Sequence, residues 1–209
     1  MFTGITTYQI IIIVVSILVS MSLHEAMHSY AAHWLGDTTA KDEGRLSINP
    51  LQHIDLITTV ALPVVMLVMG LPPLLAAKPV PFNPNNVRYG EFGAAIVGIA
   101  GPLTNLVLAI LAAISLHLFG AGFSLEVAEA IVLFLSVNIG FFVFNMIPLP
   151  PLDGSRVLYA FAPRPLQRIM ETIEGFGFFA ILAFVLLLFP LIQPYYVQAM
   201  QWIFNLLLG

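Results

Sequence analysis

Six long apolar runs constrain this sequence more than any other feature. They fall at about 7–34, 55–77, 92–118, 127–147, 174–190 and 194–208. The hydrocarbon core of a bilayer is about 30 Å thick, so a helix that crosses it needs roughly 20 apolar residues. The chain has 59% apolar and only 9% charged residues, and a soluble protein of this length would expose far too much apolar surface. The sequence therefore predicts an integral membrane protein.

The runs predict an all-α polytopic membrane protein, a bundle of about five or six transmembrane or re-entrant helices. Three prolines in the stretch from Lys78 to Arg88 rule out an ordinary helix there and favour a short extended, membrane-associated segment. The few charges, with a net value of −4, give no reason to expect a nucleic-acid partner. The expected surroundings are a lipid bilayer.

Basic residues set the expected orientation, because cytoplasmic loops carry an excess of Lys and Arg. Four lie between the first and third runs: Lys41, Arg45, Lys78 and Arg88. Three follow the fourth run: Arg156, Arg164 and Arg168. The loop 119–126 has none. If the basic segments are cytoplasmic, the runs 7–34, 92–118 and 127–147 cross in alternating directions. The run 55–77 must then begin and end on one side, so we favour a re-entrant segment over a straight crossing.

An HExxH motif, His24-Glu25-Ala26-Met27-His28, lies near the end of the first apolar run. Residues four apart share a helix face, so both imidazoles can bind one zinc ion. Glu25 lies beside them, where it can act as a general base without being a ligand. Ionisable residues inside an apolar helix are costly unless they serve a site. The alternative is a polar patch where the chain leaves the lipid.

A catalytic zinc ion usually has three protein ligands and one open position. Asp153 is the favoured third ligand, because it follows a stretch with three prolines after the fourth run. Irregular backbone at membrane depth is tolerated where it lines a cavity. The alternative is that Asp153 caps a short following helix, and taken alone the two readings are equally good.

Several motifs together resemble the site-2 protease family of intramembrane zinc metalloproteases. They are HEAMH (24–28), GPLTN (101–105) and NMIPLPPLDG (145–154), in that order. GRLSINPLQHID (44–55) and AKPVPFNP (77–84) resemble the small prokaryotic branch without a PDZ or CBS domain. The resemblance implies one Zn²⁺ per chain held by His24, His28 and Asp153, with Glu25 as general base. It also implies hydrolysis of peptide bonds within or next to transmembrane segments of protein substrates.

On this reading residues 1–209 form one protease domain, with a catalytic core at about 7–162 and accessory helices over 166–209. The expected location is the inner membrane of a prokaryotic cell, with the active site toward the cytoplasmic side. The accessory helices could also mediate a homo-oligomer.

Five further residues are candidate site residues. Asn145 could donate a hydrogen bond to the oxyanion, or bond to a neighbouring helix. Asn105 has the same two readings, substrate contact or a helix-to-helix bond. Val80, Pro81 and Phe82 could bind an unwound substrate by adding a strand, or belong to a plain surface loop. The competing functions are a metal-binding transporter without proteolysis and a silent membrane scaffold.

Overall fold

The computed structural model describes residues 6–49 and 81–209, and within them the protein is all-α, without strands. This confirms the predicted fold class. Four helical segments in these residues are long and apolar enough to cross a membrane. They are Thr7–Trp34, Gly90–Gly122, Leu125–Asn145 and Phe178–Leu208. The run 55–77, expected to be re-entrant, lies outside the described residues.

Helix α1 (Thr7–Trp34) begins at a capping box. The Thr6 hydroxyl accepts a hydrogen bond from the Gln9 backbone N–H, and the Gln9 side chain accepts one from the Thr6 N–H. These bonds satisfy two of the N–H groups that a helix start leaves without partners. The Gln9 amide also donates to Glu129 at 2.6 Å, which joins the start of α1 to α5.

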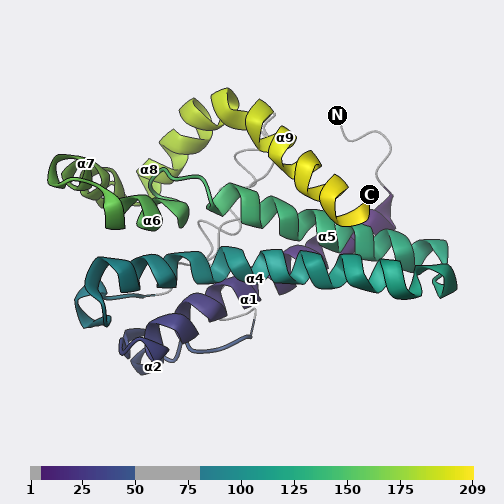
Figure 1. Ribbon diagram of the computed structural model, residues 1–209, viewed down its shortest axis with the longest axis horizontal. Helices are drawn as coiled ribbons and strands as arrows, with labels where there is room; N and C mark the ends of the chain where they lie inside the picture. The colour runs from purple at the N-terminus through teal and green to yellow at the C-terminus, as the bar shows by residue number, and fades with distance from the viewer. Residues whose placement is uncertain (1–5, 50–80) are drawn as a thin grey trace.

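Helices α4 (Gly90–Phe119) and α5 (Leu125–Asn145) pack against α1 and against each other. The short 3₁₀ turn η4 (Gly120–Gly122) connects α4 to α5, and Ser124 caps the start of α5. Figure 1 shows the three long helices side by side, with the turn between α4 and α5 at the end where α1 begins and α9 ends. The small residues Ala109, Ala112 and Ala113 are buried in the core of this bundle, where small side chains allow close approach of helices.

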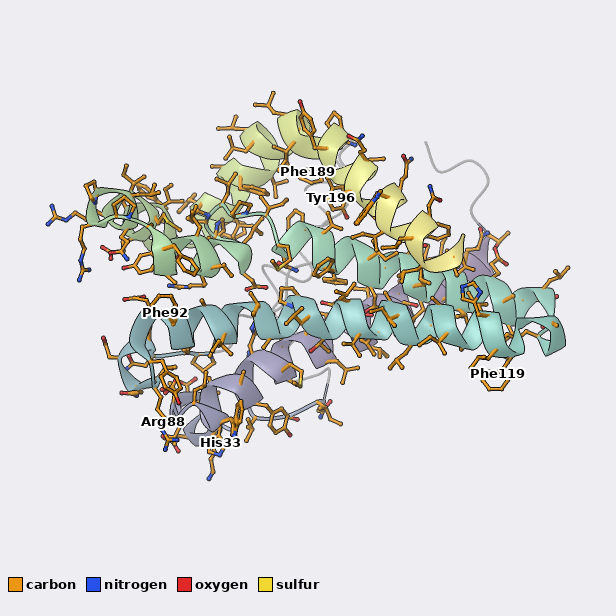
Figure 2. The ribbon with its side chains drawn as sticks, in the orientation of Figure 1. His33, Arg88, Phe92, Phe119, Phe189 and Tyr196 are labelled. Atoms are coloured by element: carbon orange, nitrogen blue, oxygen red, sulfur yellow. The ribbon has the colours of Figure 1, made fainter. Side chains whose placement is uncertain are left out.

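The other end of the bundle carries the short elements. Figure 1 shows α2 (Thr39–Asp42), α6 (Gly154–Phe161) and α7 (Arg164–Gly175) gathered there. Phe92 of α4 packs edge-to-face on Phe161 of α6, with ring centroids 5.4 Å apart. In Figure 2, Phe92 lies at this end of α4 and Phe119 at the opposite end.

The last two apolar runs form one curved segment instead of separating at their prolines. It consists of α8 (Phe178–Ala183), a π-helical stretch (Phe184–Leu188) and α9 (Phe189–Leu208). Proline lacks the N–H that an α-helix needs, and a widened π turn can absorb this defect. The π turn ends at Leu188, two residues before Pro190, and the chain bends there and continues. Figure 2 shows Phe189 and Tyr196 on the inner side of the bend, where both rings pack on Phe144 of α5.

The predicted extended segment near 78–88 is described from residue 81 onward. Asn83 has extended backbone angles, and a 3₁₀ turn η3 (Pro84–Asn86) follows it. Arg88 then donates its N–H to the Leu35 carbonyl at 2.9 Å. This bond holds the segment beside the end of α1, where Figure 2 shows His33 and Arg88 close together.

Candidate metal centre

His24 and His28 lie one helical turn apart on the buried face of α1, with 4% and 9% of their surfaces exposed. Their rings meet nearly at right angles, with centroids 4.7 Å apart. The two Nε2 atoms are 3.0 Å apart. The spacing of the HExxH motif therefore brings both imidazoles to one point, as residues four apart on a helix should.

Asp153 reaches the same point from the loop between α5 and α6. Its Oδ2 lies 3.0 Å from Nε2 of His24 and 3.4 Å from Nε2 of His28. Although Asp153 occupies the N-cap position of α6, its side chain makes no capping hydrogen bond. The structure thus places the carboxylate with the imidazoles, as the ligand reading predicts. The ligand atoms of His24, His28 and Asp153 all lie within 4.8 Å of one another and could hold a metal ion.

The tautomer of His28 makes this cluster a fit for a cation. Nδ1 of His28 lies 2.7 Å from the carbonyl oxygen of Val97, and a carbonyl only accepts hydrogen bonds. In a neutral ring Nδ1 therefore carries the proton, and Nε2 presents its lone pair to the cluster. The lone pair and the Asp153 carboxylate repel each other unless a cation lies between them. Two imidazoles and one carboxylate also match a known donor set of catalytic zinc.

The neighbouring helix α4 has glycines where it passes the cluster. A Cβ atom on Gly101 would overlap Nε2 of His28 and would lie 2.6 Å from Nε2 of His24. A Cβ on Gly98 would lie 2.8 Å from Cβ of Arg156 and 3.1 Å from the Asp153 carbonyl oxygen. Gly154 is equally confined, because its Cβ would lie 2.6 Å from the Met146 carbonyl. The absence of side chains at these positions creates the space in which the three ligands meet.

Of the other predicted residues, Glu25 is half-buried on α1, close enough to His28 for their charges to interact. Asn145 is the last residue of α5, and its amide donates to the Phe141 carbonyl of its own helix at 3.1 Å. Asn105 is fully buried, and its Oδ1 lies 2.7 Å from Nδ1 of His24. Asn105 of α4 thus makes a hydrogen bond to α1, which is the second of the two roles predicted for it.

The expected substrate segment is described only in part. Val80 lies outside the described residues, and Pro81 is half-buried. The Phe82 side chain packs against a small cluster that includes Leu35, Val87 and Val97. Because the Val97 carbonyl also holds His28, the segment passes near the metal centre.

Sequence reasoning missed Asn138 and Asp37. Asn138 of α5 is fully buried and bonds to Asn105. Asp37 is fully buried after α1 and accepts hydrogen bonds from Thr39, Asn83 and Asn86. An asparagine within an apolar run is itself a signal for a buried bond, whereas nothing in the sequence distinguishes Asp37 from its polar neighbours.

Comparison with known proteins agrees with this geometry. The chain is 34% identical over 186 residues to "Putative zinc metalloprotease YwhC" of Bacillus subtilis, covering 86% of this chain and 81% of that protein. It is 27% identical over 201 residues to "Putative zinc metalloprotease Rip2" of Mycolicibacterium smegmatis, covering 93% and 73%. The protein of the same name from Mycobacterium tuberculosis is 25% identical over 201 residues, covering 94% and 74%. No family model and no solved structure matches the chain. With a helical membrane fold, the HExxH motif and these relatives, the chain belongs to the site-2 protease family of zinc metalloproteases.

Proposed function

We propose that this protein is an intramembrane zinc metalloprotease that hydrolyses peptide bonds within or next to transmembrane segments of membrane proteins. The observation that carries the proposal is the meeting of His24, His28 and Asp153 within 4.8 Å on a membrane-spanning helix and a distant loop. At about 1.5 Å per residue, His24 lies roughly 15 Å along the helix axis from Trp34. This depth supports a position of the cluster inside the apolar span.

The residues of the chain divide the chemistry between them. When bound, zinc supplies Lewis-acid chemistry, polarising the scissile carbonyl and making water more acidic. Glu25 takes the proton of the attacking water and passes it to the leaving amine. Asn145 has two amide hydrogens, and one of them bonds to the Phe141 carbonyl. The second can be donated to the developing oxyanion.

Substrate would be held in an extended form, because a helical segment does not present its amides to the site. The backbone of Val80, Pro81 and Phe82 is the proposed docking edge, by addition of a strand. The packing of Phe82 near Val97 supports this role, since it holds the edge close to His28.

The proposed orientation places the metal centre toward the cytoplasm of a prokaryotic cell. Six basic residues in the described part of the chain belong to the segments after α1 and to α6 and α7: Lys41, Arg45, Arg88, Arg156, Arg164 and Arg168. These elements lie together at the end of the bundle opposite the turn between α4 and α5 (Figure 1). A basic end of this kind stays on the cytoplasmic side.

The test is metal analysis and cleavage of a transmembrane peptide by purified protein and its Glu25→Gln variant. We expect about one zinc per chain in both, and a loss of cleavage of about 10²–10⁴-fold in the variant, because a general base contributes that much. Asp153→Ala should lose zinc and cleavage together. Wild-type protein that binds zinc but cleaves no transmembrane peptide would overturn the protease assignment and favour a metal transporter. A Glu25→Gln variant that cleaves at the wild-type rate would overturn the general-base role of Glu25.

A further inference from the structure

A chain of hydrogen bonds leads from the metal centre across the bundle to α5. Nδ1 of His24 meets Oδ1 of Asn105 at 2.7 Å. Nδ2 of Asn105 donates to Oδ1 of Asn138 at 3.0 Å. Nδ2 of Asn138 donates to the Phe134 carbonyl at 2.8 Å. Both amides are fully buried, so water does not compete for these bonds.

The donor and acceptor of each hydrogen bond in this series are determined by the Phe134 carbonyl at its α5 end. The backbone oxygen of Phe134 only accepts, so Asn138 must turn its amide nitrogen toward it and its oxygen toward Asn105. Asn105 must then offer its nitrogen to Asn138, and it also donates to the Ser20 carbonyl at 3.4 Å. Its oxygen is left for His24. Nδ1 of His24 is therefore the protonated nitrogen, and its Nε2 presents a lone pair.

From this we infer that Asn138 is a positioning residue, which acts through Asn105 to fix the nitrogen that His24 uses to bind metal. The inference rests on the proposed function, since it concerns the same zinc site. Without Asn138, only the longer bond to the Ser20 carbonyl, at 3.4 Å, would oppose rotation of the Asn105 amide. The amide could then turn and donate its nitrogen to Nδ1. His24 would then carry its proton on Nε2, facing Asp153, and that proton would occupy the position of the metal.

The alternative is that Asn138 only joins two helices, as buried asparagines do in membranes. The experiment compares zinc affinity, by chelator competition, in wild type, Asn138→Leu, Asn105→Leu and the double variant. Ser136→Ala is the matched control, because Ser136 makes a similar bond to its own helix, to the Val132 carbonyl at 2.8 Å. Unfolding of the metal-free proteins and the visible spectrum of the Co²⁺-loaded proteins are measured alongside.

We expect Asn138→Leu to weaken zinc binding about 10–100-fold, because removing a residue that orients a metal-binding side chain typically has an effect of this size. The Co²⁺ spectrum should also change. In the Asn105→Leu background the same change should have little further effect, and Ser136→Ala should bind zinc normally. Wild-type affinity in a folded Asn138→Leu protein, or equal losses in both backgrounds, would overturn the inference. Failure of the wild-type protein to bind zinc would instead overturn the proposed function.

Discussion

Gly101 illustrates at the scale of one residue how little space the metal centre has. A Cβ added to Gly101 would overlap Nε2 of His28. Hydrogen bonds to Val97 and Asn105 keep the two imidazoles from moving aside. Overpacking of this kind costs about 1–3 kcal/mol. We expect Gly101→Ala to weaken zinc binding roughly 5–150-fold, the equivalent of that energy. Gly120→Ala is the control for this titration, because nothing lies within 4 Å of a Cβ there; equal affinity in both variants would refute the steric argument.

The site residues that could be predicted lie close together in the sequence or belong to a residue type that is rare at membrane depth. His24, Glu25 and His28 follow from helix periodicity, and Asp153 follows from a shortage of acidic residues at membrane depth. Asn138 could not be assigned its role in advance, because the rotation of α5 against α4 decides which residue its amide meets. The rotation of one helix against another cannot be derived from the sequence alone.

At the scale of elements, Asp37 joins the end of α1 to the segment around Asn83 and Asn86. Its carboxylate accepts hydrogen bonds from Asn83 N–H at 2.8 Å and from the Thr39 backbone at 3.1 Å. Burial raises the pKa of Asp37, but the hydrogen bonds from Thr39, Asn83 and Asn86 outweigh it and hold the pKa below its ordinary value of 3.8. The bonds therefore stabilise the fold where the carboxylate is ionised.

We expect Asp37→Asn to lower the Tm, since one hydrogen bond to a charged group is worth about 1.5–3 kcal/mol. A folded-state pKa below the unfolded one means that this stability is complete above about pH 4 and disappears as the pH falls further. The Tm difference from wild type should thus be constant between about pH 5 and 8 and shrink in more acidic buffer. Asp42→Asn, at an exposed aspartate in α2, should change little; a difference that grows on acidification would contradict the assignment.

The helical elements could be predicted from apolar runs, but their joints could not. The runs 174–190 and 194–208 form one bent segment, because a π turn absorbs the defect at Pro190. In the described part of the segment 78–88, a 3₁₀ turn follows Asn83. Both joints depend on backbone geometry over four or five residues, to which apolar periodicity is insensitive.

For the whole molecule, a bound metal would connect α1 to the loop before α6. A ligand that binds only the native state stabilises it by about 2.7 kcal/mol at 100 times its Kd. We expect a chelator to lower the Tm of the zinc-loaded protein in detergent, and to leave that of Asp153→Ala unchanged. The measurement is thermal unfolding followed by circular dichroism. An equal shift in both proteins would mean that the chelator acts elsewhere.

The ligands of the centre are far apart in the chain, and this separation has a consequence for biosynthesis. His24 and His28 are synthesised with α1, whereas Asp153 follows only after α4 and α5. A ribosome must therefore add 129 residues after His24 before the donor set exists. During synthesis the nascent protein therefore lacks the donor set for a metal until α1, α4 and α5 are all present.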